Sequence, residues 1–238
     1  MSLRLRSDGV FQLDDTLSKL RLAVFDCDGT LVDSQASIVS SMQAACAAHN
    51  IPEPEPEAIR RMVGLPLEVA IASLFPELDK NKVWQVREGY REAFTVLRQR
   101  GDVHEPLFQG GLDALRVLED TGWILGVATG KSYKGLISTL DTHRLTIRFQ
   151  TLQTADLAQG KPHPEMLLNA MAETGVDAAS TVMIGDTTYD MEMAINAGTM
   201  ALGVAWGYHE SQELMDAGAH IVIDDFSQLP EAVERLSE

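Results

Sequence analysis

Short apolar stretches alternate with amphipathic stretches over most of the chain. Residues 20–25 read Leu-Arg-Leu-Ala-Val-Phe, a mostly apolar run typical of a strand buried in a parallel sheet. Similar short runs recur later, at residues 123–128, 151–154, 181–184, 201–204 and 221–223. Because helical stretches separate these runs, the pattern predicts an α/β fold with a doubly wound parallel sheet covered by helices on both faces.

The region between the first two predicted strands has helical periodicity instead. Apolar residues recur three or four positions apart over residues 37–49 and 83–97. Between them, residues 58–75 predict two short helices, broken at Gly64 and Pro66. We interpret the apolar and aromatic face of residues 83–97 as part of a hydrophobic core.

This pattern predicts two domains and an extension. An all-helical cap domain, residues 36–105, is inserted into an α/β core domain formed by residues 20–35 and 106–238. Residues 1–19 precede the first strand and carry weak patterning, so we interpret them as an N-terminal extension of unknown role.

Composition excludes several classes of partner. The 238 residues are 45% hydrophobic, which is enough for a sizeable core, and no apolar run approaches the roughly 18 residues of a membrane span. The start of the chain lacks the apolar centre of a signal peptide, so we expect a cytoplasmic protein without a membrane partner. A formal charge of −16 argues against nucleic acid, and an anionic substrate needs local positive charge. Monomer and homodimer stay open.

Two carboxylates follow the first predicted strand directly. The segment 26–30 reads Asp-Cys-Asp-Gly-Thr, with the acids at Asp26 and Asp28. Side chains alternate along an extended backbone, so these two acids project to the same side. Catalytic groups in open α/β sheets sit at such carboxyl ends of strands. The segment therefore predicts an active site at this edge of the sheet.

Further polar signals follow other strands and the loop near residue 160. Thr129, Gly130 and Lys131 come after the second strand, and Lys161 lies in a Pro-rich loop. The strand at residues 181–184 is followed by Asp186 and Asp190. Because the carboxyl ends of parallel strands converge, we expect these groups to gather at one crevice.

Several converging acids require a cation. Two ionised carboxylates about 4 Å apart repel by roughly 4 kcal/mol at an effective dielectric constant near 20. All-oxygen ligands suit Mg²⁺. A lysine such as Lys161 offsets the charge of a phosphate, and the Thr129 hydroxyl suits donation to a phosphoryl oxygen.

Taken in this order, the motifs resemble the haloacid dehalogenase superfamily, and within it the phosphoglycolate-phosphatase-like branch with a helical cap after the first motif. The matching segments are 26–34, Thr129, Lys161 and 185–190, and the resemblance covers about residues 20–235. It implies a Rossmann-like core and hydrolysis of a small phosphorylated metabolite.

The resemblance also implies roles for single residues. Asp26 attacks phosphorus to give an aspartyl-phosphate, while Asp28 protonates the leaving oxygen and then acts as base for the attacking water. Mg²⁺ is bound by the Asp26 carboxylate, the backbone carbonyl of Asp28 and Asp186, with Asp190 as a ligand or an orienting residue.

Asp28 indicates phosphate-ester hydrolysis or phosphoryl transfer, since other branches carry a different residue at this position. We predict a Mg²⁺-dependent phosphatase acting on a small phosphomonoester such as phosphoglycolate. A mutase resembling β-phosphoglucomutase is the alternative; it shares both acids but commonly has Gly-Val where this chain has Gly29-Thr30. A pyrophosphatase of the same fold, sugar-phosphate or nucleotide substrates, and a catalytically silent binding protein also stay open.

Substrate selection is expected from the second motif and the cap. Many relatives have Asn where Gly130 stands, so Lys131 either faces the leaving group or is a solvated loop lysine. In the cap, we expect Gly64 and Arg61, with Arg60 beside it, near the substrate, because the arginine fork suits a carboxylate or a second phosphate. Exposed helix charges are the alternative for at least one of these arginines.

Overall fold

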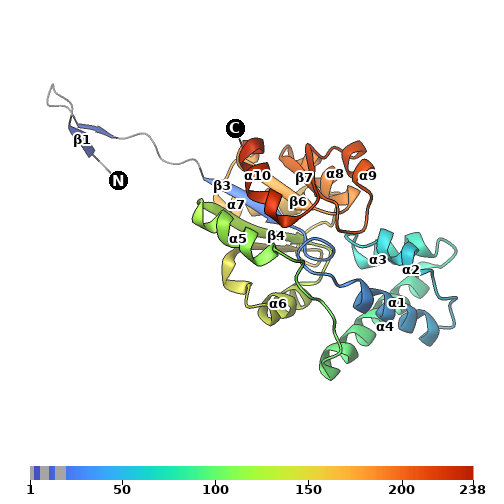
Figure 1. Ribbon diagram of the computed structural model, residues 1–238. Coiled ribbons are helices and arrows are strands. Elements are labelled where there is room, and N and C mark those ends of the chain that lie inside the picture. Colours follow the sequence, from blue (N-terminus) through green and yellow to red (C-terminus); the bar gives the residue numbers. More distant parts are fainter. Residues whose placement is uncertain (1–2, 6–10, 14–19, 238) are drawn as a thin grey trace.

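One parallel sheet forms the centre of the protein. The computed structural model describes residues 3–5, 11–13 and 20–237. The strands of the sheet are β3 (Arg21–Phe25), β4 (Trp123–Thr129), β5 (Phe149–Thr154), β6 (Thr181–Gly185), β7 (Met200–Val204) and β8 (Ile221–Ile223). They lie in the order β5-β4-β3-β6-β7-β8 (Figure 1). The strand order therefore reverses between β3 and β6, the place where α/β sheets of this kind form their binding crevice.

Helices cover both faces of the sheet, as the alternation along β3 requires. Ala23 and Phe25 belong to one core cluster together with residues of three helices, and Leu22 and Val24 belong to a second cluster with residues of three others. The first set is α5 (Gly111–Asp120), α6 (Tyr133–Thr142) and α10 (Leu229–Ser237); the second is α7 (Glu165–Thr174), α8 (Thr188–Ala197) and α9 (Ser211–Asp216). Short 3-10 helices are η1 (Thr146–Arg148), η2 (Ala178–Ser180) and η3 (Phe226–Gln228). The predicted doubly wound α/β fold is confirmed.

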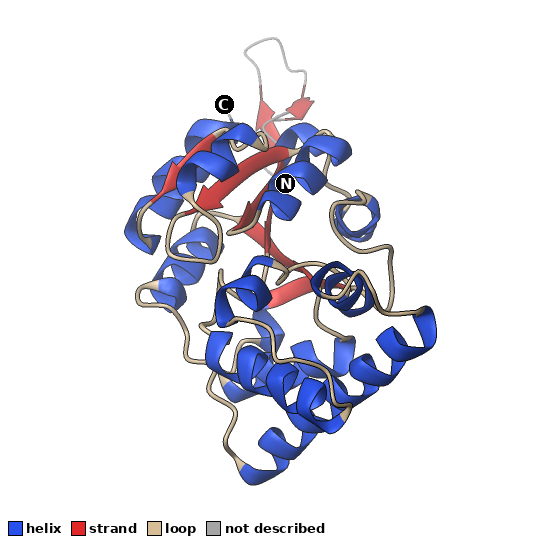
Figure 2. Cartoon of the chain, turned by 90° about the vertical axis from the view of Figure 1, so that its right-hand side faces the viewer, coloured by secondary structure: helices blue, strands red, loops and turns tan. Residues whose placement is uncertain are grey.

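The insertion after β3 is entirely helical in the described part of the chain. Its helices are α1 (Gln35–Ala48), α2 (Pro56–Arg61), α3 (Leu67–Leu74) and α4 (Lys80–Arg100). They share a hydrophobic core of their own, formed by residues such as Met42, Ile71 and Val86. Figure 1 shows these helices beyond one end of the sheet, and Figure 2 views the molecule from that side. A cap with its own core can move as a unit relative to the α/β core.

Helix ends follow local sequence signals. The Asp79 side chain accepts a hydrogen bond from the backbone N–H of Lys82 at 2.8 Å and so begins α4. Gly175 and Gly198 end α7 and α8 with φ angles of +70° and +71°, a conformation that glycine adopts without steric cost. These two C-terminal glycines were expected from the sequence.

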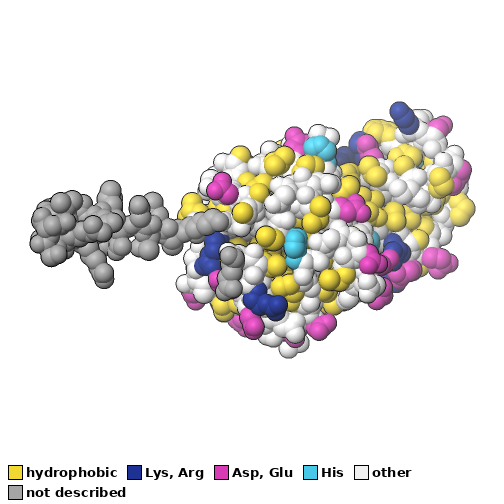
Figure 3. All heavy atoms as spheres, turned by 90° about the horizontal axis from the view of Figure 1, so that it is seen from above, with side chains coloured by type: hydrophobic (Ala, Val, Ile, Leu, Met, Phe, Trp, Pro, Cys, Tyr) yellow, Lys and Arg dark blue, Asp and Glu magenta, His cyan; other side chains and the backbone are white. Residues whose placement is uncertain are grey.

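The extension predicted for residues 1–19 lies largely outside the described residues. Its described parts are β1 (Leu3–Leu5) and β2 (Phe11–Leu13), which pair in antiparallel fashion. The hydrophobic pattern did not predict this pair. Within the described part of the chain, no helix combines the length and apolar content needed to cross a bilayer. Acidic side chains outnumber basic ones on the face shown in Figure 3, in keeping with the charge of −16.

Candidate active site

Asp26 lies directly at the point where the strand order reverses. Its backbone N–H donates to the Ile184 carbonyl at 2.9 Å, which continues the pairing between β3 and β6 by one residue. The chain then turns at Gly29, whose φ is +85°. A Cβ atom on Gly29 would lie 2.3 Å from Asp186 Oδ2, so only glycine allows the turn to pass this close to the acid.

Three acids and one lysine, distant in sequence, meet beside this turn. Asp26, Asp186 and Asp190 are buried, and each offers a carboxylate oxygen within 4.8 Å of the others. The Lys161 ammonium lies 2.8 Å from Asp26 Oδ1 and 2.6 Å from Asp190 Oδ1, and its side chain has no exposed surface. The structure thus brings together four of the residues expected at the site.

The charges of this cluster do not balance. Three ionised carboxylates and one ammonium leave a net charge of −2. Burial raises the pKa of Asp26 to about 7, with Lys161 opposing this and Asp190 adding to it. Burial and the charges of Asp26 and Asp190 also raise the pKa of Asp186 well above its ordinary value. In Lys161 the two neighbouring carboxylates outweigh the effect of burial, so its pKa is raised and the lysine stays charged.

The donor set fits a divalent cation. Asp26 Oδ2 is buried and has no hydrogen-bond partner among residues 20–237, which is costly for a carboxylate oxygen. A divalent ion would balance the charge of −2 and give this oxygen a ligand bond, and oxygen-only ligands suit a hard cation. The cluster of Asp26, Asp186 and Asp190 is therefore a candidate metal centre.

Neighbouring donors fix how the acids point. Asp186 accepts hydrogen bonds from Thr30 Oγ1 at 2.7 Å and from the Tyr208 backbone N–H at 3.0 Å. Asp190 accepts from the Thr187 backbone N–H and hydroxyl at 3.0 and 2.7 Å, in a capping box at the start of α8. Sequence reasoning missed these contacts, although the three-residue spacing of Thr187 and Asp190 is a known helix-start signal.

The Asp28 carboxylate belongs to a separate ion-pair network. It accepts a hydrogen bond from Ser34 and lies 2.8 Å from the Lys131 ammonium. Lys131 is also 2.9 Å from Glu105, which in turn accepts a hydrogen bond from Thr139. With only 10% of its side chain exposed, Lys131 is not a solvated loop lysine. Glu105 lies on the return connection from the cap, where no sequence pattern pointed to it.

Thr129 ends β4 and Gly130 follows it, and both lie in the wall of a cavity between core and cap. The Thr129 hydroxyl oxygen accepts from the Lys131 backbone N–H at 3.3 Å, which leaves its proton available to a phosphoryl oxygen. A Cβ atom on Gly130 would lie 2.9 Å from the Gly64 carbonyl oxygen and 3.0 Å from that of Leu65. The cap loop therefore rests directly on this glycine, which gives a steric reason for Gly130 at this position.

We expect Gly130→Asn to weaken catalysis. The added side chain must push the cap loop at Gly64 and Leu65 outward, since backbone carbonyls cannot yield as a flexible side chain can. We expect kcat/KM for para-nitrophenyl phosphate to fall by roughly tenfold, because a small misplacement of groups at the site is costly. Gly175→Asn is the matched control, since nothing lies within 4 Å of a Cβ there. Equal activity of the two variants would show that cap contact at Gly130 is irrelevant.

The two cap arginines lie away from the cavity, in contrast to our expectation. Arg61 forms two contacts with the Glu213 carboxylate on α9, at 3.2 and 2.5 Å, and so ties the cap to the core. The Arg61 backbone carbonyl also accepts from the Tyr189 hydroxyl at 3.3 Å. Arg60 pairs with Glu57 on its own helix, which agrees with the alternative that one of these arginines is an exposed helix charge. Gly64, by contrast, does line the cavity.

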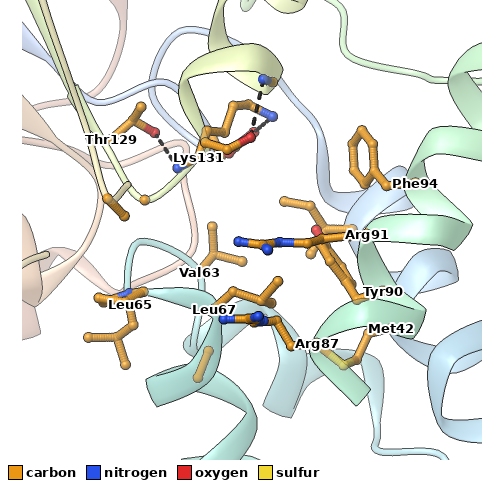
Figure 4. A pocket seen from close by; sticks show the side chains of 18 of the residues that line it. Met42, Val63, Leu65, Leu67, Arg87, Tyr90, Arg91, Phe94, Thr129 and Lys131 are labelled. Carbon is orange, nitrogen blue, oxygen red and sulfur yellow. Dashed lines mark hydrogen bonds and ion pairs between the residues drawn. The ribbon is translucent and has the colours of Figure 1, made fainter. Parts of the chain in front are cut away.

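A cavity of about 840 Å³ opens between core and cap over the acids (Figure 4). Asp26, Asp28, Thr129 and Lys131 line it from the core. The cap side chains labelled in Figure 4 are Met42, Val63, Leu65, Leu67, Arg87, Tyr90, Arg91 and Phe94. Tyr90 and Phe94 of α4, interpreted from sequence as core, thus also form part of the wall.

Divalent metal is expected to stabilise the protein through the acid cluster. Saturating Mg²⁺ should raise Tm by about 5 °C or more, since a ligand at 100 times its Kd adds roughly 2.7 kcal/mol and 1 kcal/mol moves Tm by about 2–4 °C at this size. Asp186→Asn should abolish the shift because it removes one ligand. Thermal unfolding with Mg²⁺ and with EDTA measures this shift in Tm. Asp113→Asn, on the surface of α5, is the control and should keep the shift. A full shift in Asp186→Asn would exclude this cluster as the binding site.

Comparison with known proteins agrees with this geometry. The family model of the haloacid dehalogenase-like hydrolases matches residues 23–204. The chain is 39% identical over 220 residues to probable phosphatase IndB of Dickeya dadantii (strain 3937), covering 90% of this chain and 94% of that one. It is 29% identical to a phosphoglycolate phosphatase of Agrobacterium fabrum, over 89% and 91% of the two chains.

The fold is also found in solved structures. A hydrolase from Pseudomonas syringae superposes with a TM-score of 0.81 at 25% identity, covering 92% of this chain and all of that one. With the family model spanning most of the chain, these likenesses extend over both core and cap. The chain therefore belongs to the haloacid dehalogenase-like hydrolase family, among its phosphatases with a helical cap.

Proposed function

We propose that this phosphatase is Mg²⁺-dependent and hydrolyses a small phosphomonoester through an aspartyl-phosphate at Asp26. One observation carries the proposal. Asp26 lies at the cavity wall with one oxygen on Lys161 and the other buried without a hydrogen-bond partner among the described residues. With Lys161 and a divalent ion beside it, the Asp26 carboxylate would be ionised, and an ionised carboxylate next to a second acid suits nucleophilic attack at phosphorus.

The chemistry divides between the two acids of the first motif. A carboxylate oxygen of Asp26 forms a bond to phosphorus while the bond to the leaving oxygen breaks, and that oxygen takes a proton from Asp28. In the second half, Asp28 accepts a proton from water, the water oxygen bonds to phosphorus and the bond to Asp26 breaks. The Thr129 hydroxyl and the Lys161 ammonium stabilise the charge on the phosphoryl oxygens.

Asp26, Asp186 and Asp190 would hold the metal ion. When bound, Mg²⁺ supplies positive charge that offsets the repulsion between the acids and the incoming phosphate. Thr30 and Thr187 keep Asp186 and Asp190 oriented toward the centre of the cluster. The ligand role of the Asp28 backbone carbonyl, implied by the family resemblance, stays a prediction.

Release of inorganic phosphate from para-nitrophenyl phosphate tests the proposal. We expect turnover with Mg²⁺ and none with EDTA. Glucose phosphates are assayed in parallel for isomerisation without phosphate release, which would instead support the mutase alternative. Pyrophosphate as the only cleaved compound would support the pyrophosphatase alternative. Inertness toward all of them with Mg²⁺ would contradict the proposal.

A further inference from the structure

Basic side chains gather on the cap wall of the cavity. Resting on the phosphatase function proposed above, we propose that the substrate carries a second negatively charged group, a carboxylate or a phosphate, bound by Arg91 and Arg87 of α4. Both guanidinium groups point from α4 into the cavity (Figure 4). Asp26, the proposed nucleophile, and Asp28, the proposed acid and base, line the same cavity from the core.

The gathering stands out against the charge of the whole chain. Lys and Arg number 19 against 35 Asp and Glu, yet five basic residues line this one cavity. They are Arg87, Arg91, Arg98, Lys131 and Lys134. Acids in the lining are Asp26, Asp28, Glu68 and Asp156. A local excess of positive charge is what an anionic substrate needs in an acidic protein.

Arg91 lines the cavity and is only weakly held by its protein partner. Lys131 is already held by Asp28 and Glu105, and Arg98 lies over the Phe94 ring at 5.3 Å. Arg91 has one ion-pair contact in the described chain, with Glu88 at 3.3 Å, and its side chain is 51% exposed. A pair this long and exposed contributes little, so an anion can replace it at small cost.

Arg87 stands one helical turn before Arg91 and faces the same way. Residues four apart share a face of a helix, and like charges in this arrangement are unfavourable. Arg87 pairs with Glu68 and Glu88, and Glu88 is shared with Arg91. Arg87 is thus held by two carboxylates, whereas Arg91 has the single long contact with Glu88 and keeps donors free for an anion. Carboxylate and phosphate are the groups that the arginine fork matches.

The cavity has room for a substrate larger than phosphoglycolate or pyrophosphate. Phosphoglycolate and pyrophosphate each have roughly nine non-hydrogen atoms and occupy on the order of 200–250 Å³ at about 25 Å³ per atom, somewhat below the share of a water in the liquid. The cavity measures about 840 Å³. Met42, Tyr90 and Phe94 supply an apolar wall, with the two rings 5.9 Å apart. The cavity therefore has room for a phosphomonoester with a body of sugar size that carries a distal anion.

Competition against para-nitrophenyl phosphate tests this inference without knowledge of the true substrate. Two matched pairs serve as competitors: glucose 6-phosphate with 6-phosphogluconate, and fructose 6-phosphate with fructose 1,6-bisphosphate. In the wild type, the member with the extra anion should compete about tenfold more strongly, as one charge-assisted contact is worth that factor or more. In Arg91→Gln, the two members of each pair should compete equally, and this ratio is compared within the variant, whatever its turnover of para-nitrophenyl phosphate.

The control is Arg116→Gln on α5. Arg116 is 55% exposed and pairs with Asp113 at 3.3 Å three residues away, which matches Arg91 and Glu88 closely. It should keep the advantage of the dianionic competitors. Stronger competition by 6-phosphogluconate than by glucose 6-phosphate indicates that the site binds a carboxylate. Stronger competition by fructose 1,6-bisphosphate than by fructose 6-phosphate indicates that it binds a second phosphate. Equal competition within both pairs, or an advantage that survives in Arg91→Gln, would overturn the inference. Failure to turn over para-nitrophenyl phosphate would instead overturn the phosphatase proposal on which it rests.

Discussion

Replacing Asp26 with asparagine is expected to lower kcat by about 10⁴-fold or more, because the reacting carboxylate is lost and an amide oxygen is a poor nucleophile. The substitution preserves shape at a buried position where Cys27 N–H and Lys161 contact one carboxylate oxygen. Turnover of para-nitrophenyl phosphate with Mg²⁺ measures the loss.

The fold should survive this change. Asp26 has a raised pKa in its metal-free surroundings, so removing its charge relieves repulsion with Asp186 and Asp190. Circular dichroism and the melting temperature without metal should therefore match the wild type closely. Asp216→Asn, at the exposed end of α9, is the control for activity. Substantial phosphatase activity in Asp26→Asn would exclude Asp26 as the nucleophile.

Replacing Lys161 with methionine is expected to reduce both activity and stability. Methionine keeps much of the side chain's length, so the change removes mainly the charge. Without the ammonium, Asp26 and Asp190 are buried with no cation beside them. Breaking a buried ion pair in this way costs about 3–5 kcal/mol, and loss of one stabilising donor lowers kcat by on the order of 10²–10³-fold.

Mg²⁺ separates the two effects of the lysine. Because the ion also offsets the acids, it should restore part of the stability of Lys161→Met but not its activity. Urea unfolding with and without Mg²⁺, together with kcat, measures both, and Lys80→Met at the exposed start of α4 is the control. A Lys161→Met protein with wild-type kcat would show that this lysine has no part in phosphoryl transfer.

The sequence predicted the parts of the structure that depend on local patterns. The strands were recognisable because buried parallel strands are short apolar runs, and β3 was placed within one residue of its observed start. The acids could be placed together because the carboxyl ends of parallel strands converge. This reasoning needed no knowledge of side-chain contacts, and it led to Asp26, Asp186 and Asp190.

Long-range partners were beyond such patterns. Arg61 was expected at the substrate, but its partner Glu213 lies 152 residues later in the chain, and nothing near either residue indicates the other. Glu105 lies on the connection from the cap back to the core and pairs with Lys131, 26 residues later in the chain. Tyr90 and Phe94 have the helical spacing that is typical of core residues. A helix face that also lines a cavity has the same spacing, so the sequence could not show that these two side chains reach the cavity.

The central claim is that Asp26 becomes covalently phosphorylated during turnover. Borohydride reduces an acyl phosphate to an alcohol, so quenching the enzyme with borohydride during turnover of para-nitrophenyl phosphate converts a phosphorylated aspartate to homoserine. Peptide mass spectrometry should then find homoserine at position 26 in the wild type with Mg²⁺, and not in the enzyme without substrate. Homoserine at another acidic position, or at none while phosphate is being released, would contradict the account.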